Sequence, residues 1–114
     1  MHELSIAGNI LEIIRDNVPE DKLCEVKTVR VELGEVSGVV SDSLKFCFDV
    51  IKLESPFPNA NIEIKKIPFI LFCNNCKLET TNTLGIRMCD GCKGFDTEII
   101  SGTEMRVTEV DLDS

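Results

Sequence analysis

Two pairs of closely spaced cysteines constrain the fold of this chain more than any other feature. Cys73 and Cys76 form one C-x-x-C pair, Cys89 and Cys92 form a second, and twelve residues separate the pairs. A two-residue spacer lets both sulfurs of a pair reach the same ion, so two such pairs can place four thiolates tetrahedrally around one metal. The spacing therefore predicts a four-cysteine metal site.

Four sulfur ligands favour zinc, and iron in a rubredoxin-like redox site is the alternative. Because four protein ligands leave no coordination position for a substrate, the site is expected to be structural. A segment of about thirty residues has little core of its own and is expected to need its metal to fold. A thioredoxin-type redox pair usually opens a helix after a strand, and neither pair has that setting.

The composition is typical of a folded domain and disfavours nucleic-acid binding. The chain has 114 residues, of which 43% are hydrophobic and 28% are charged, and its formal net charge is −8. Binding to a phosphate backbone relies on clustered Lys and Arg. Nucleic acid is therefore not an expected partner, whereas a basic protein or a metal cation is.

The sequence shows no membrane or secretion signal, and we expect a cytoplasmic protein. No stretch reaches the roughly 18 consecutive apolar residues of a membrane helix, and the N-terminus lacks the basic start of a signal peptide. In a reducing compartment, paired cysteines indicate a metal or redox site rather than disulfides. Of the two other cysteines, Cys47 is expected to be a buried small hydrophobe, and Cys24 has no evident partner.

The hydrophobic pattern predicts two helices and three strands outside the cysteine segment. Three-four spacing predicts one helix over Leu4–Val18 and a second that Ser41 opens as its N-cap. Alternating apolar residues predict strands over Val26–Leu33, Asn61–Ile67 and Thr103–Val110. The GEVSGV stretch between the first strand and the second helix either turns the chain or contributes to a site.

These elements predict an α+β fold, with a small three-stranded sheet, two helices and an inserted zinc-ribbon-like domain. Residues 1–68, completed by a strand within 103–114, are expected to form the first domain. Residues 69–102 are expected to form the inserted four-cysteine domain.

The only histidine of the chain, His2, directly follows Met1. The Met1 amine, the His2 backbone nitrogen and the His2 imidazole can close two fused chelate rings, and a nitrogen-rich planar donor set favours Ni(II) or Cu(II). The fourth position is left for the Glu3 backbone nitrogen, the Glu3 carboxylate or a partner. Glu3 also offsets the positive end of the first helix, which disfavours a cation. The alternative is a solvated His2 with no ligand role.

Several stretches together resemble the HypA/HybF family of hydrogenase maturation nickel chaperones. They are MHELSIA, VRVELGEVSGV, the two cysteine pairs and SGTEMRVTEVDL, and they span essentially the whole chain in order. The resemblance implies a nickel-binding α/β domain and a zinc domain. It also implies delivery of nickel to the precursor of the [NiFe]-hydrogenase large subunit, together with the GTPase HypB.

The resemblance assigns ligands by position. Nickel is expected at Met1, His2 and Glu3, and zinc is expected at the four paired cysteines, namely Cys73, Cys76, Cys89 and Cys92. The chain departs from many relatives in the residue after each pair, where Lys77 and Lys93 replace the usual glycine. This departure keeps the ligand spacing but can alter backbone hydrogen bonds to the sulfurs.

We therefore predict a nickel metallochaperone that is not an enzyme. With a single histidine at the chain start, the sequence offers no nucleophile–base–acid constellation. Two alternatives stay open, a zinc-ribbon adaptor that only binds proteins and a rubredoxin-like redox protein. The sequence leaves a homodimer, a role for urease as a second client and the docking face for the GTPase undecided.

Overall fold

A computed structural model describes residues 2–113 of the chain, which divide into two compact units. The first unit consists of the described residues up to Glu32, of Val39–Lys65 and of the described residues from Arg106. The second unit consists of Leu33–Gly38 and Lys66–Met105. No helix of the described part is long and apolar enough to cross a membrane.

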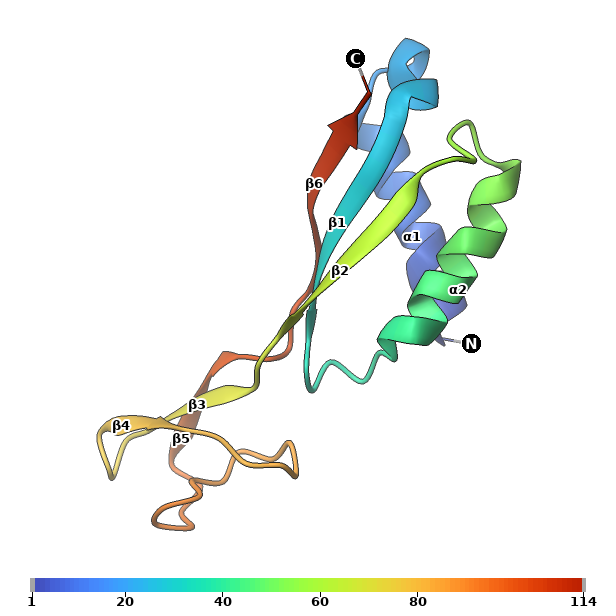
Figure 1. The fold of residues 1–114 in the computed structure, drawn as a ribbon. Coiled ribbons are helices and arrows are strands. Elements are labelled where there is room, and N and C mark those ends of the chain that lie inside the picture. The colour runs from blue at the N-terminus through green and yellow to red at the C-terminus, as the bar shows by residue number, and fades with distance from the viewer. Residues whose placement is uncertain (1, 114) are drawn as a thin grey trace. The chain divides into compact units, whose positions relative to one another are not determined.

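The first unit combines two α-helices with a three-stranded sheet of order β2-β1-β6 (Figure 1). The helices are α1 (His2–Asn17) and α2 (Ser41–Ile51), and the strands are β1 (Val26–Gly34), β2 (Asn61–Ile67) and β6 (Met105–Leu112). Short 3-10 helices, η1 (Glu20–Glu25) and η2 (Lys52–Glu54), follow α1 and α2. Two helices and this sheet confirm the predicted α+β class.

One hydrophobic core joins the helices of the first unit to its sheet. Ile14 of α1, Phe48 of α2 and Val29 of β1 are fully buried in it. Cys47 is buried beside Phe48, as expected of a small hydrophobe. The three-four spacing of α1 and α2 and the alternation in β1 therefore reflect this shared core.

The alternate side chains of β1 carry charge and link the three strands. Arg30 Nη2 donates to Asp111 Oδ2 of β6 at 2.7 Å, and Arg30 also pairs with Glu63 of β2. Arg106 Nε of β6 donates to Glu32 Oε1 at 2.8 Å. These ion pairs neutralise much of the acidic charge on the sheet.

The second unit contains a separate sheet of order β4-β3-β5, whose strands pair antiparallel. They are β3 (Ile70–Cys73), β4 (Leu78–Thr80) and β5 (Thr97–Ser101). Phe69 and Leu71 are the large buried side chains of this unit, together with Leu33. Such a small set of apolar residues gives the second unit a minimal core.

Two glycines allow a close backbone approach within the second unit. The Gly34 N–H donates to the Glu104 carbonyl at 2.7 Å, and the Val36 N–H donates to the Gly102 carbonyl at 2.8 Å. A Cβ on Gly34 would lie 2.1 Å from the carbonyl carbon of Gly102. Gly102 has φ of 114°, and a Cβ there would lie 2.6 Å from the Cα of Phe69. Only glycine fits at either position.

The predicted N-cap of the second helix is wrong by one residue. Ser41 is the first residue of α2, and Val40 occupies the N-cap without a side-chain hydrogen bond to the helix. The Val40 N–H instead donates to Glu3 Oε2 at 3.2 Å. A carboxylate from α1 therefore stands at the N-terminus of α2, where the helix dipole favours negative charge.

Candidate metal centres

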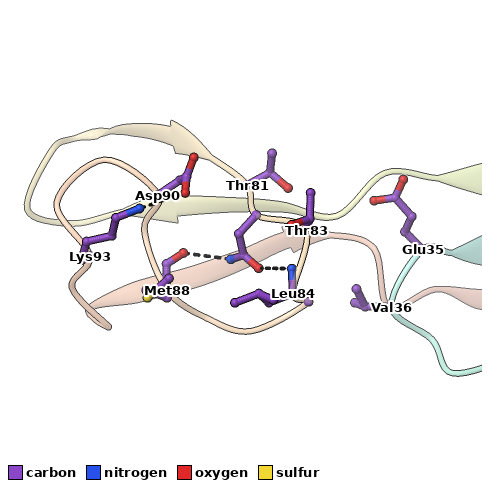
Figure 2. Close-up of a pocket in the computed structure, with 10 residues that line it drawn as sticks. Glu35, Val36, Thr81, Thr83, Leu84, Met88, Asp90 and Lys93 are labelled. Atoms are coloured by element: carbon purple, nitrogen blue, oxygen red, sulfur yellow. Dashed lines mark hydrogen bonds and ion pairs between the residues drawn. The ribbon is translucent and has the colours of Figure 1, made fainter.

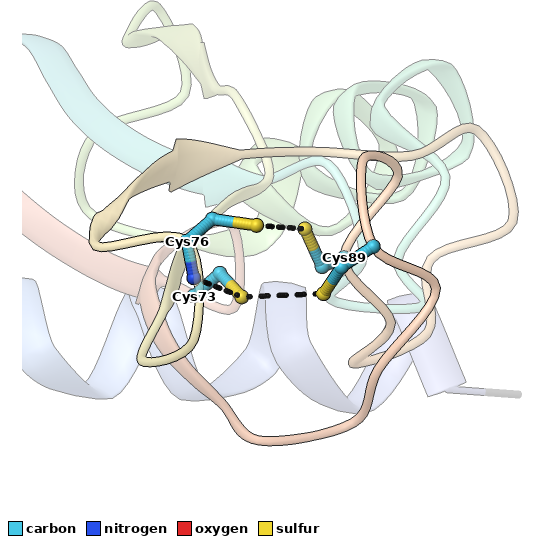
Figure 3. A group of neighbouring side chains, drawn as sticks. Cys73, Cys76 and Cys89 are labelled. Carbon is cyan, nitrogen blue, oxygen red and sulfur yellow. Dashed lines mark hydrogen bonds between the residues drawn. The ribbon is translucent and has the colours of Figure 1, made fainter.

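The four paired cysteines converge on one point in the second unit. Their sulfur atoms all lie within 4.8 Å of one another, and they form the one such group of potential ligands among residues 2–113. Each short contact joins one pair to the other: Cys73 Sγ lies 3.7 Å from Cys92 Sγ, and Cys76 Sγ lies 4.0 Å from Cys89 Sγ (Figure 3). Four sulfurs in this arrangement can hold a thiophilic metal ion.

A tight turn positions each pair. The Lys77 N–H donates to the Cys73 carbonyl at 2.8 Å, and the Lys93 N–H donates to the Cys89 carbonyl at 2.9 Å. Both lysines close their turns in the left-handed region, with φ of 58° and 62°. Each lysine thus adopts the conformation that glycine would adopt more easily, and the sulfurs keep their spacing.

Replacing Lys77 with glycine is expected to stabilise the metal-loaded second unit. The left-handed conformation costs a non-glycine residue about 1–2 kcal/mol. Glycine avoids this cost but loses more backbone entropy on folding, which offsets about half of the benefit. The expected net gain in unfolding free energy is therefore about 0.5–1 kcal/mol. Chemical denaturation followed by amide NMR signals of the second unit measures the change. Lys77→Ala is the matched control because alanine keeps the Cβ, and an equal gain from alanine would contradict the explanation.

The cysteine thiols of the cluster differ in pKa. Hydrogen bonds with the sulfurs of Cys92, Cys73 and Cys89, together with burial, raise the pKa of the Cys76 thiol to about 12. The backbone amides of Cys92 and Gly91 stabilise the Cys89 thiolate and lower its pKa to about 6, against the opposing effect of burial. One sulfur is thus ionised at neutral pH while another retains its proton.

The apparent affinity of the cluster for metal is expected to rise with pH. An ion that binds all four sulfurs must displace the Cys76 proton, so affinity should fall by at least about tenfold for each pH unit below 8. The fall should steepen below about pH 6, where the Cys89 thiolate also gains a proton. Competition with a chromophoric chelator between pH 5 and 8 would show this slope, and a flat profile would contradict it.

The N-terminal candidate residues lie at the start of α1, apart from Met1, which is outside the described residues. His2 is the first residue of α1, and its side chain is 61% exposed. Its Nδ1 lies 3.6 Å from Glu3 Oε2. The hydrogen bond from the Val40 N–H is the main cause that lowers the pKa of Glu3, so an ionised carboxylate stands beside the imidazole.

The helical start at His2 also suits coordination by backbone nitrogen. The first four N–H groups of an α-helix have no acceptor within the helix. The backbone nitrogens of His2 and Glu3 fall in this group because α1 begins at His2. A metal that displaces an amide proton here would break no hydrogen bond of the helix.

The GEVSGV stretch divides between the two units. Glu35 accepts a hydrogen bond from the Phe69 N–H at 3.1 Å and lines an open pocket of about 840 Å³ in the second unit (Figure 2). In that pocket Asn82 accepts a hydrogen bond from the Leu84 N–H at 3.0 Å, which orders the loop before the second cysteine pair. Val40, just after the stretch, instead bonds Glu3. Valine does not mark such a contact in a sequence, whereas asparagine favours a bond from the backbone N–H two residues on, as Asn82 shows.

Together these features fit a small metal-handling accessory protein: an exposed imidazole beside a mostly buried carboxylate at the start of α1, and four converging cysteines in the second unit. The family model for hydrogenase/urease nickel incorporation, the metallochaperone HypA, matches residues 1–112. The chain belongs to the HypA family and is a nickel metallochaperone of hydrogenase maturation, as the sequence predicted.

Curated relatives agree with this assignment, and a solved structure shares the fold. The hydrogenase maturation factor HypA of Desulfatibacillum aliphaticivorans is 34% identical, over 98% of this chain and 87% of the relative. That of Albidiferax ferrireducens is also 34% identical, over 99% of this chain and 100% of the relative. The solution structure of the Ni metallochaperone HypA from Helicobacter pylori covers 98% of this chain and 97% of its own, with a TM-score of 0.68 and 21% identity. At that identity the likeness shows the fold alone.

Proposed function

We propose that this chain carries Ni(II) on a chelate formed by the Met1 amine, the His2 backbone nitrogen and the His2 imidazole, with Glu3 completing the site. The observation that carries the proposal is the placement of an exposed His2 imidazole 3.6 Å from the Glu3 carboxylate. Nickel is the cargo, and a chelate of three nitrogens that leaves the fourth position to Glu3 suits an ion that must be passed on. The first unit is then the nickel-binding domain.

The four cysteines are proposed to hold Zn²⁺ as a structural ion. Their convergence within 4.8 Å supports this assignment, as does the stabilised thiolate of Cys89. A closed set of four thiolates suits zinc and leaves no position for substrate or cargo. The second unit is then the zinc-binding domain, built around residues 69–102.

The proposed partners are the GTPase HypB and the precursor of the [NiFe]-hydrogenase large subunit. Membership of a hydrogenase maturation family supports partners of this kind. The net charge of −8 favours a partner surface that is basic. We place the exchange in the cytoplasm, where a reducing environment keeps the cysteine pairs available for metal.

Nickel titration of three forms of the protein tests the proposal. They are the protein with its native untagged N-terminus, His2→Ala, and a form extended before Met1. We expect both altered forms to bind nickel more than tenfold more weakly, a loss of over about 1.4 kcal/mol, while zinc content stays constant. Calorimetry measures nickel binding, and elemental analysis measures zinc.

Equal nickel binding by all three forms would show that His2 is a bystander and would reject the N-terminal site. Zinc without nickel binding in any form would favour a protein-binding adaptor. Iron in place of zinc, with its visible absorption, would favour a redox protein. Each result separates one alternative from the proposal.

A further inference from the structure

Helix α2 is apolar on two sides, and the core covers only one of them. Leu44, Cys47 and Phe48 face the core of the first unit and are buried. Phe46 and Val50 lie on the outer side, where they are 70% and 50% exposed. Leu53, one turn further in η2, is 64% exposed.

These three exposed side chains form one line along the helix, which we call the α2 stripe (Phe46, Val50, Leu53). Residues three and four apart lie on the same side of a helix, so spacings of four and three align all three. Single exposed apolar residues are ordinary on a protein surface, whereas adjacent large ones indicate a contact site. Figure 1 shows α2 at the outside of the first unit, with α1 as its neighbouring helix.

Carboxylates lie along both sides of the α2 stripe. Helical spacing places Asp42 and Asp49 along one flank and Glu54 along the other. Asp49 pairs with Lys45 at 3.7 Å and with Lys52 at 3.3 Å. Within residues 2–113 no ion pair engages Asp42 or Glu54. A row of apolar side chains flanked by carboxylates is complementary to a row of apolar side chains flanked by basic residues, and two of these carboxylates have no ion-pair partner within residues 2–113.

We propose that the α2 stripe docks a basic amphipathic helix of a partner protein. Such a helix would place its apolar face on Phe46, Val50 and Leu53 and its Lys or Arg side chains beside Asp42 and Glu54. This is helix-to-helix recognition through anchors at i, i+4 and i+7. The charges would speed encounter, and the apolar anchors would supply most of the affinity.

The area of the stripe disfavours a second copy of this chain as its occupant. A stable dimer buries about 800 Å² on each partner, and three partly exposed side chains of this size provide roughly half of that or less. Short-lived complexes have smaller interfaces. A second copy would also bring its own acidic rim and supply few basic groups to neutralise it.

The position of the stripe connects docking to the N-terminal site. Phe46 lies six residues from Val40, or about 9 Å along the helix axis, and the Val40 N–H is bonded to Glu3. The Phe46 end of the stripe is therefore the end nearer to Glu3, and a helix docked there would reach toward the N-terminal residues. A role in cargo transfer rests on the proposed function, whereas docking itself does not.

Peptide binding to the full zinc-loaded protein tests the docking surface. The probe is a fluorescent helical peptide of about 18 residues with leucines at i, i+3, i+4 and i+7 and flanking lysines. Two controls share its leucines, one with flanking glutamates and one with a scrambled order. We expect saturable binding of the lysine peptide at least tenfold tighter than either control, and amide NMR shifts centred on Phe46, Val50 and Leu53.

Phe46→Ser is expected to weaken this binding at least tenfold. Phe95→Ser is the matched control, because Phe95 is also 70% exposed but lies in the second unit; it should change binding less than twofold. Asp42→Asn combined with Glu54→Gln should weaken binding mainly at low salt. Nickel titration of Phe46→Ser should match the unaltered protein, which keeps this test separate from that of the nickel site.

Three results would overturn the proposal. The first is equal binding of the scrambled peptide, and the second is an equal effect of Phe46→Ser and Phe95→Ser, because both indicate non-specific attraction to an acidic protein. The third is a concentration-dependent dimer that Phe46→Ser abolishes, because it would assign the stripe to a second copy of the chain.

Discussion

Removal of the cysteine-bound metal is expected to unfold the second unit while the first stays folded. The second unit has few large buried side chains, and its strands are only three to five residues long. A unit of this size rarely folds on apolar burial alone, and structural zinc contributes an apparent 10–16 kcal/mol or so in small modules. The first unit has its own core of residues from both helices and the sheet.

Amide NMR before and after a strong chelator measures this effect unit by unit. Signals of β3, β4 and β5 should collapse to unfolded positions, and those of α1 and α2 should remain. Cys76→Ser should reproduce the loss by removing one ligand, whereas Cys24→Ser, at an exposed cysteine of the first unit, should not. A second unit that stays folded without metal would refute a structural role for the ion.

Replacing Phe48 with alanine is expected to cost the first unit about 3–5 kcal/mol of unfolding free energy. Phe48 is fully buried in the core, so alanine would leave a cavity that the neighbouring side chains fill only in part. Phe46 lies two residues earlier on the exposed side of the same helix, and Phe46→Ala should change stability by no more than about 0.5 kcal/mol.

Denaturant unfolding followed by helical circular dichroism compares the two variants. The pair holds residue type, helix and change of helix propensity constant, so the difference isolates burial. Equal destabilisation by both substitutions would mean that Phe46 also packs into the core and that the α2 stripe is not a free surface.

The main elements of the first unit could be predicted from hydrophobic spacing alone. Three-four spacing predicted α1 and α2, and alternation around Val29 and Val31 predicted β1, because a shared core imposes these periods on the sequence. The buried side of the last strand, β6, does not follow from the sequence pattern. Val107 and Val110 both pack against the core although they are three positions apart, so simple alternation does not identify the buried side of β6.

Other features depend on contacts between distant residues, which local pattern does not encode. Val40, the N-cap residue of α2, donates its N–H to Glu3, which lies 37 positions earlier in the chain. The strands β3, β4 and β5 are too short to show a period and are organised around the cysteine turns. The cysteine spacing predicted that four sulfurs would meet, but not that Lys77 and Lys93 would adopt left-handed conformations. The ligand roles of Met1, His2 and Glu3 and of the cysteines stay predictions.

The hydrogen bonds of Gly34 and Val36 limit how evolution or engineering can replace the second unit with that of a relative. Leu33–Gly38 belongs to the second unit although 27 residues separate it from Lys66. A transplant of one continuous segment from Lys66 to Met105 would leave behind the bonds from Gly34 to Glu104 and from Val36 to Gly102. A donor graft must therefore carry two pieces of sequence, and recombination at a single pair of breakpoints would rarely yield a working hybrid.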